Sequence, residues 1–342
     1  MTGSISDNFH SYPPLFRPNP SDDHGERYSP NPKFDSDSES EIPVVDLGSS
    51  MSPAENLSKI CREWGMFRLV NHGVPMELLT QLHEHANKLF SLDFESKQAL
   101  ITTPILYFWG SPALTMSGNV RQTGPCPDNL NWLEGLNVPL AKNSNFEYDD
   151  PLLESFRSLL EEYGKHQTRL AKAMFRAMAE DLNFPPSKSK SYLSLSTGCL
   201  RVYRYLRCPI SDRRWGIDSH TDSSVLSILH QDQVGGLQVF KNDKWLDVKP
   251  IHGTLIVNLG DMMQAMSNDS YISVKHRVRV NKKKERISIG YFVFPAEDAV
   301  IESSRYGPFT YPQFQAAKEL DLKTMGVKVG LPRFRITEDG TN

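Results

Sequence analysis

The spacing of apolar residues changes once along this chain, close to residue 194. Before that point, apolar positions recur every three or four residues over 78–90 and 151–183, which predicts two amphipathic helices. After it, apolar residues gather in short runs broken by Gly, Asn, Asp and Lys, a pattern typical of a β barrel or jelly roll. The sequence therefore predicts an α+β fold in which helices flank a β core. The expected strands are 200–205, 225–229, 237–240, 245–248, 254–259, 278–280 and 287–294.

Helices are also expected at both edges of the folded region. Ser52-Pro53 is typical of a helix start, with serine as the cap and proline at the first helical position, and 312–325 is expected to be a last helix that braces the sheet. The first 40 residues are rich in Ser, Asp, Pro and Asn, and they contain too little apolar surface to offset the entropy of ordering. The expected divisions are a disordered tail over 1–40, an N-terminal helical region over 41–185, a β core over 195–300, and a C-terminal helix and tail over 301–342.

Aromatic residues accumulate where the periodicity fails, between residues 102 and 145. A connection of this length without clear helices is uncommon in a compact domain unless it lines a functional site. Packing of the same rings at the surface is the alternative. The aromatic residues in and next to this segment are Tyr107, Phe108, Trp109, Trp132 and Phe146.

Composition and charge narrow the class of protein. The 342 residues carry a formal net charge of −3, which creates no electrostatic field that would attract polyanions. The basic cluster at 281–286 has no interleaved aromatic residues and is interpreted as a hairpin tip, so nucleic acid is not expected as a partner. The chain shows neither a signal-peptide pattern nor a run of about 18 apolar residues, and its four cysteines are widely spaced. We expect a monomer with reduced thiols, located in the cytoplasm, with the nucleus as the other option.

A histidine and a carboxylate, His220 and Asp222, stand two residues apart beside an apolar run. Side chains alternate along a strand, so these two share one face and could bind one metal ion. Two histidines and one carboxylate leave about three positions open on an octahedral ion, as in non-haem Fe(II) oxygenases. The same spacing recurs at His230-Gln231-Asp232, which leads into a glycine turn and is interpreted as a solvated polar cluster. For the third ligand, spacing alone leaves both His252 and His276.

The order of the motifs downstream is distinctive. Val274-Lys275-His276-Arg277-Val278 is followed by Arg286-Ile287-Ser288 at the head of the run ISIGYFVFP. In this order the chain resembles the plant 2-oxoglutarate- and Fe(II)-dependent dioxygenases, which carry His-x-Asp, a distant His and Arg-x-Ser on a double-stranded β-helix. The resemblance covers nearly everything after Glu41. Within the family the chain is most similar to the gibberellin oxidases, through the segments WGIDSHTDSS, QVGGLQVF, LIVNLGDMMQAMSN and VGLPRF.

The resemblance implies an iron enzyme on a jelly-roll core. His220, Asp222 and His276 are the implied Fe(II) ligands and catalytic residues, so His230 and His252 are expected to be dispensable. The implied co-substrate is 2-oxoglutarate, the implied oxidant is dioxygen, and ascorbate is the expected reductant.

The expected co-substrate residues are Arg286, Ser288 and Tyr205. Arg286 and Ser288 lie two residues apart on one face of a strand, where a guanidinium and a hydroxyl can bind the far carboxylate of 2-oxoglutarate. Tyr205 matches the last tyrosine of the family's Asn-Tyr-Tyr-Pro-x-Cys motif, which helps to hold the co-substrate. The chain departs from that motif, because Tyr203, Arg204 and Leu206 stand where the family has Asn, Tyr and Pro.

The same resemblance implies a gibberellin or a gibberellin precursor as the substrate, and a reaction that lowers the pool of active hormone. Such a substrate is a rigid, mostly apolar carboxylic acid whose charge needs a cation, for which Arg121 or Arg204 is expected. An oxygenase of another plant acid such as auxin, or of a flavonoid, is the alternative within the family, and a non-catalytic jelly-roll binding protein is the alternative outside it. The residues expected to line the substrate site are Tyr107, Trp109, Trp132, Glu134 and Phe294.

Overall fold

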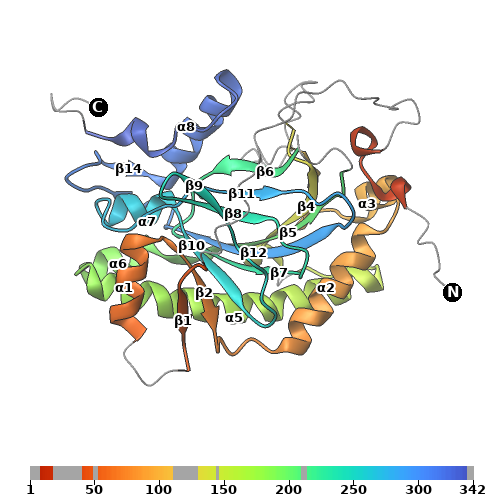
Figure 1. Ribbon diagram of the computed structural model, residues 1–342, viewed down its shortest axis with the longest axis horizontal. Helices are drawn as coiled ribbons and strands as arrows, with labels where there is room; N and C mark the ends of the chain where they lie inside the picture. The colour runs from red at the N-terminus through yellow and green to blue at the C-terminus, as the bar shows by residue number, and fades with distance from the viewer. Residues whose placement is uncertain are drawn as a thin grey trace.

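Two β-sheets packed face to face form the centre of the molecule (Figure 1). The computed structural model describes residues 8–17, 41–48, 53–110, 130–143, 146–208 and 214–336. The large sheet contains, in order, β1 (Val44–Asp46), β2 (Met66–Val70), β10 (Leu255–Leu259), β7 (Leu226–Gln231), β12 (Arg286–Phe294), β5 (Ser194–Tyr205), β4 (Leu133–Pro139) and β3 (Leu106–Trp109). The small sheet contains β6 (Trp215–His220), β11 (His276–Arg279), β8 (Leu237–Lys241) and β9 (Lys244–Asp247). This arrangement confirms the expected jelly roll.

Apolar side chains from both sheets fill the space between them. Phe108, Leu133 and Tyr205 of the large sheet share one buried cluster with Val239 and Val278 of the small sheet. Because side chains alternate along a strand, the other face of the large sheet is available to the helices. The two sheets are thereby held in a fixed relative position.

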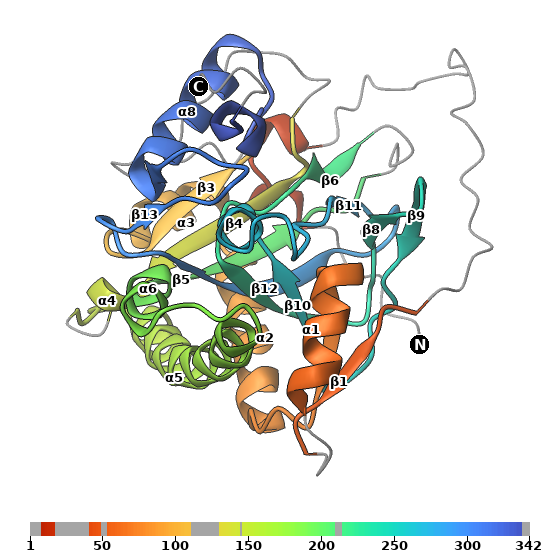
Figure 2. The same cartoon turned by 90° about the vertical axis from the view of Figure 1, so that its left-hand side faces the viewer.

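Helices cover that outer face of the large sheet (Figure 2). The longest, α5 (Pro151–Asp181), packs on β5, β7 and β12, between α1 (Pro53–Glu63) and α2 (Met76–Phe90). It begins where Asp150 accepts a hydrogen bond of 2.9 Å from the Leu153 N–H. On the other side of the sheets lies α8 (Tyr311–Thr324) (Figures 1 and 2). The shorter elements are α3 (Phe94–Leu100), α4 (Leu140–Asn143), α6 (Pro186–Tyr192), α7 (Asp261–Met266), β13 (Val300–Ile301) and β14 (Phe309–Thr310).

The strands expected after residue 194 are present, whereas β3, β4 and β6 were not expected. β4 contains Gly135 and Asn137, which are depleted in strands, yet it is paired with β3 on one side and β5 on the other. A Cβ atom at Gly135 would lie 2.7 Å from the Phe108 ring, so a glycine is needed there for β3 and β4 to pack. Within the segment 102–145, the described residues form β3 and β4 at the edge of the large sheet and the short helix α4, while residues 111–129 and 144–145 lie outside the described residues.

Part of the expected N-terminal tail is folded. Residues 8–17 form the short 3-10 helices η1 (Phe9–Ser11) and η2 (Pro14–Phe16), which we call the N-terminal strap. Tyr12 and Phe16 are 2% exposed and cluster with Leu206. The aromatic residues of this otherwise polar segment thus provide an apolar contact that its overall composition did not predict. Residues 1–7 and 18–40 lie outside the described residues.

A buried network of charges fixes the strap to the sheet. Lys97 Nζ lies 2.6 Å from Glu134 Oε2 and donates a hydrogen bond of 2.6 Å to the Ser11 carbonyl. Arg204 Nη1 lies 2.9 Å from Glu134 Oε1, and Arg204 Nη2 lies 2.8 Å from Glu285 Oε1. Burial lowers the pKa of Lys97 to about 8, although Glu134 opposes that shift. Two cations thus face two carboxylates, so each buried charge of the network has an opposite charge beside it.

No helix in the described parts of the chain has the length and apolar character needed to cross a membrane.

Candidate active site

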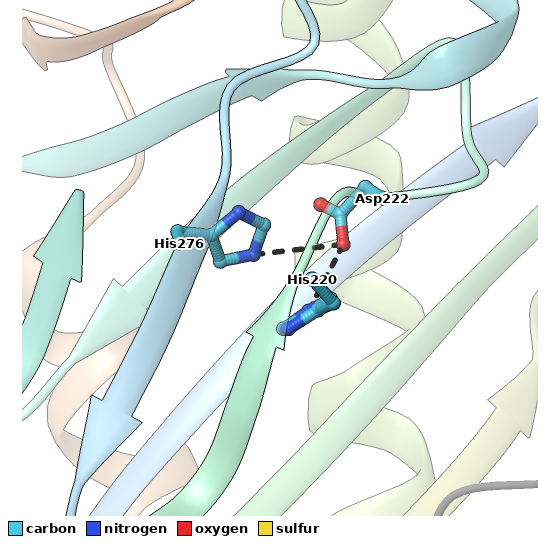
Figure 3. Close-up of side chains that lie close together, drawn as sticks. All are labelled: His220, Asp222 and His276. Atoms are coloured by element: carbon cyan, nitrogen blue, oxygen red, sulfur yellow. Dashed lines mark ion pairs between the residues drawn. The ribbon is translucent and has the colours of Figure 1, made fainter. Parts of the chain in front are cut away.

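The three predicted metal ligands come together at one edge of the small sheet (Figure 3). His220 ends β6 and His276 begins β11, and the antiparallel pairing of these strands sets the two histidines opposite each other. Asp222 follows in the turn before β7, so it reaches the histidines through the turn and not as a strand neighbour of His220. The nitrogen and oxygen atoms that these residues offer lie within 4.8 Å of one another.

The carboxylate of Asp222 is oriented by the protein. Its Oδ2 atom accepts hydrogen bonds from Ser227 Oγ at 2.9 Å and from Asn258 Nδ2 at 2.8 Å. Its Oδ1 atom lies 3.7 Å from Nε2 of His220 and 3.7 Å from Nε2 of His276. One oxygen is therefore fixed to the large sheet while the other faces both histidines.

Each histidine is oriented through its other nitrogen. His220 Nδ1 lies 2.7 Å from the Asp218 carbonyl, and His276 Nδ1 lies 3.2 Å from the Val274 carbonyl. A carbonyl oxygen can only accept a hydrogen bond, so Nδ1 carries the hydrogen and the Nε2 lone pair is free to bind a metal. Burial, and then the neighbouring His276, lower the pKa of His220. The pKa of the Asp222 carboxyl is also lowered, because the two histidines and the two hydrogen bonds outweigh its burial.

This set of donors fits a divalent iron ion. It offers two imidazole nitrogens and one carboxylate oxygen, and a metal binds the imidazole in its neutral form and the carboxylate in its ionised form. Three ligands from one side leave coordination positions open, in contrast to the closed four-ligand sites that hold structural zinc. The geometry therefore suits a metal that binds further molecules.

The rival histidines lie elsewhere. His230 is 9% exposed, and its Nδ1 lies 2.8 Å from Nε2 of His83 on α2, outside the space between the sheets. His252 is exposed in the turn before β10. Neither joins the metal cluster among the described residues. His230 and Gln231 are buried and pair with β12, while Asp232 is half-buried, so this segment is not the solvated cluster that its turn signal indicated.

Arg286 is a buried cation without an acidic partner in the described parts of the chain. The side chain is 2% exposed, and its Nη2 atom donates a hydrogen bond of 2.8 Å to Gln231 Oε1. Its Nη1 atom lies 3.3 Å from Ser288 Oγ, while its Nε atom has no hydrogen-bond partner. The guanidinium carbon lies 4.7 Å from the centre of the Tyr205 ring. Burying a charge is costly unless it is paired, so this cluster is arranged to receive an anion.

Four residues expected to line the substrate site lie instead beside the strap or the buried charges that hold it: Tyr107, Trp109, Trp132 and Glu134. Their sheet neighbours Phe108 and Leu133 face that space, and the alternation of side chains turns Tyr107, Trp109 and Glu134 to the outer face. The rings of Trp109 and Trp132 pack on Phe16 of the strap, at 5.6 and 4.4 Å between centroids. The Tyr107 hydroxyl donates a hydrogen bond to Glu134, which is completely buried.

Of the two arginines expected to bind an acidic substrate, only Arg204 lies in the described residues. Arg204 faces the strap and is paired with Glu134 and Glu285, so it is not available to a ligand between the sheets. Arg121 lies outside the described residues. Phe294, by contrast, stacks on Tyr311 of α8 with 4.7 Å between ring centroids.

Sequence reasoning missed several residues that complete this region. Gln231, Ser227 and Asn258 orient the cation and the carboxylate just described, and Arg201 and Lys318 add charge near α8. Of these, only Arg201 carried a signal, because it stands two and four residues before Tyr203 and Tyr205 and so shares their face of β5.

Comparisons with known proteins agree with this geometry. Residues 196–295 match the 2OG-Fe(II) oxygenase superfamily, and residues 42–154 match the family described as non-haem dioxygenase in morphine synthesis N-terminal. Gibberellin 2-beta-dioxygenase 8 of Arabidopsis thaliana is 37% identical over 309 residues, covering 86% of this chain and 87% of that protein. Gibberellin 2-beta-dioxygenase 6 of Oryza sativa subsp. japonica is 35% identical over 315 residues, covering 86% of this chain and 85% of that protein.

Solved structures share the fold. JOX2 in complex with 2OG, Fe and JA superposes with a TM-score of 0.70 at 29% identity, covering 84% of this chain and 87% of that one. The dioxygenase for auxin oxidation in rice superposes with a TM-score of 0.68 at 26% identity, covering 86% of this chain and all of the other. The chain therefore belongs to the 2OG-Fe(II) oxygenase superfamily and is an Fe(II)- and 2-oxoglutarate-dependent oxidoreductase.

Proposed function

We propose that this oxygenase oxidises gibberellins or their precursors and lowers the pool of active hormone. The observation that carries the catalytic part is the pairing of the His220, Asp222 and His276 cluster with the unneutralised Arg286. The relatives named gibberellin 2-beta-dioxygenases, 32–37% identical to this chain, support the substrate.

His220, Asp222 and His276 are the residues proposed to hold Fe(II). Bound iron supplies the redox chemistry, in which dioxygen, 2-oxoglutarate and a substrate C–H bond give succinate, carbon dioxide and a C–O–H group. The chain contributes the arrangement of the ligands, because Asp218, Val274, Ser227 and Asn258 hold them in one orientation.

Arg286, Ser288 and Tyr205 are proposed to bind the far carboxylate of 2-oxoglutarate. β12 and β5 pair Arg286 with Tyr205, and both side chains face the space between the sheets. Burial raises the pKa of the Tyr205 phenol, so it stays a neutral hydrogen-bond donor. Gln231 fixes the guanidinium before the co-substrate arrives, which limits the ordering cost of binding.

The substrate acid is proposed to bind further along the same two strands. Arg201 faces Gly290 in the register that pairs Tyr205 with Arg286, and its guanidinium lies 4.9 Å from the centre of the Phe292 ring. Its Nε donates a hydrogen bond of 3.3 Å to Asn137 Oδ1, and it pairs with no carboxylate in the described residues. This position takes the role that was expected of Arg204.

Lys318 of α8 is the second proposed cation. It is partly buried and makes no hydrogen bond or ion pair with the described residues. Burial, with the nearby charges of Arg201 and Lys328, lowers its pKa to about 8, while Glu319 and Asp261 oppose the shift. Tyr311 on the same helix stacks on Phe294 and offers an apolar wall beside these charges.

The rival within the family is an auxin oxygenase, supported by the likeness to the rice dioxygenase for auxin oxidation. Auxins are also apolar acids, so a cationic site fits both substrates. The higher identity to gibberellin 2-beta-dioxygenases favours the gibberellin assignment.

The iron assignment is tested by replacing ligands and rivals alike. In His276→Ala we expect iron content and succinate formation to fall together by about 100-fold or more, because one of three anchoring bonds is lost. His252→Ala is the matched control and should keep both, with the circular dichroism spectrum unchanged in each variant. Full iron in His276→Ala, with iron lost in His252→Ala, would contradict the assignment.

The co-substrate assignment is tested with Arg286→Lys. Lysine keeps the charge but loses the planar fork, and a hydrogen bond to a charged group contributes about 1.5–3 kcal/mol. The KM for 2-oxoglutarate should therefore rise by about 10- to 100-fold while iron stays bound. Arg305→Lys at the surface is the control, and an unchanged 2-oxoglutarate KM in Arg286→Lys would refute the role.

The substrate assignment is tested with Fe(II), 2-oxoglutarate, ascorbate and a panel of gibberellins, gibberellin precursors, auxin and flavonoids, read by mass spectrometry. We expect new oxidised masses from gibberellin acids. For their methyl esters, which lack the charge, kcat/KM should fall by about tenfold or more. Arg201→Met and Lys318→Met should narrow the difference between acid and ester. Turnover of auxin or a flavonoid with every gibberellin inert would show that the gibberellin assignment is wrong.

The pH dependence of substrate binding tests Lys318. Since this amine is charged only below its pKa of about 8, the KM of an acidic substrate should rise by about tenfold between pH 7 and pH 9. Lys318→Arg carries a permanent charge and should flatten the rise. Identical pH profiles for the wild type and Lys318→Arg would exclude Lys318 as the titrating group.

A further inference from the structure

A lysine from the C-terminal segment reaches the loop that carries two of the proposed iron ligands. Lys328 follows α8, and its Nζ atom donates hydrogen bonds to the Thr221 carbonyl at 2.6 Å and to Thr221 Oγ1 at 2.9 Å. Thr221 stands between His220 and Asp222. The third contact of the ammonium group is with Asp261 Oδ2 at 2.8 Å, so all three of its protons are used.

Asp261 links this lysine to the segment that carries the third ligand. Its Oδ1 atom accepts a hydrogen bond of 2.8 Å from Ser273 Oγ, three residues before His276. Its backbone N–H donates a hydrogen bond of 2.8 Å to the carbonyl of Asp222 itself. The side chains of Lys328 and Asp261 are only 14% and 4% exposed, so the pair is little screened by solvent.

The loop after Asp222 also accepts hydrogen bonds from the start of α7. The Gly260 N–H donates to the Val225 carbonyl at 3.1 Å, and the Met262 N–H donates to the Ser224 carbonyl at 3.2 Å. A Cβ atom at Gly260 would lie 2.1 Å from the Ser224 carbonyl oxygen, so only glycine allows this approach. Asp222 therefore depends for its backbone position on α7, and α7 is joined to Lys328 through Asp261.

We propose that Lys328 and Asp261 are positioning residues that hold both metal-binding segments in register, so that tight Fe(II) binding requires the segment after α8 to be docked. This inference rests on the proposed iron site. It makes the C-terminal segment part of that site, although no residue of the segment belongs to the metal cluster. Lys318 lies on α8, which leads into Lys328. The proposed acid site and the proposed metal site therefore both depend on the docking of α8 and the segment after it.

The test is metal affinity measured on the protein freed of metal. Fe(II) under anaerobic conditions, and Co(II) as a stable substitute, are titrated calorimetrically into the wild type, Lys328→Met, Asp261→Asn and the double variant. We expect each single variant to raise the metal Kd by about 10- to 100-fold, the range typical of residues that orient metal ligands. The double variant should cost less than the sum of the two single changes, because it leaves no unpaired buried charge.

Lys323→Met on α8 is the matched control, because that lysine is exposed, and it should bind metal as the wild type does. Thermal unfolding of the metal-free proteins separates positioning from general stability, since a purely structural pair would lower the midpoint without changing the metal Kd. A wild-type metal Kd in Lys328→Met would overturn the proposal.

A replacement variant and the metal binding of the wild type and His276→Ala separate a failure of folding, of the iron site and of the positioning role. If Lys328→Met does not fold, Lys328→Gln, which keeps an amide donor for Thr221, replaces it and should raise the metal Kd by a smaller factor. If the wild type binds no Fe(II) or Co(II), the proposed iron site fails. If the wild type binds metal, His276→Ala does not and the Lys328 variants bind metal with the wild-type Kd, only the positioning role fails.

Discussion

The two carboxylate oxygens of Asp222 have partners in different sheets, and the geometry of the site depends on this arrangement. Oδ2 is tied to Ser227 of β7 and Asn258 of β10, both in the large sheet. Oδ1 faces His220 and His276, which belong to the small sheet. A shift of one sheet against the other would separate the carboxylate from the imidazoles. The apolar cluster between the sheets therefore fixes the geometry of the metal site as well as the fold.

Strand β5 serves two functions because its side chains alternate. Arg201, Tyr203 and Tyr205 face the space between the sheets, where Tyr205 lies beside Arg286. Arg204 faces the opposite way and binds Glu134 and Glu285 in the network that holds the N-terminal strap. The departure from the family motif at Arg204 thus falls at a position whose side chain contacts the strap.

The buried cations fall into two groups that the structure separates clearly. Lys97 and Arg204 each contact a buried carboxylate, which compensates their loss of hydration. Arg286 and Lys318 have no such partner among the described residues. A buried or partly buried cation without a counter-ion is costly by itself, so its presence indicates an anionic ligand. Both proposed anions, 2-oxoglutarate and the substrate acid, are assigned on this basis.

Much of the fold and of the candidate site could be predicted from the local pattern of residues in the sequence. The period of apolar residues predicts α5 and the strands of the core, and the order of His220-Thr221-Asp222, His276 and Arg286-Ile287-Ser288 carries the resemblance that implies an iron oxygenase. Tertiary structure decided what local pattern does not encode. β4 forms despite Gly135 because strands on both sides pair with it, and Glu134 and Arg204 neutralise each other across neighbouring strands. Lys328 meets Thr221 only because α8 returns the chain to the edge of the sheets, a contact between residues 107 positions apart that spacing in the sequence does not reveal.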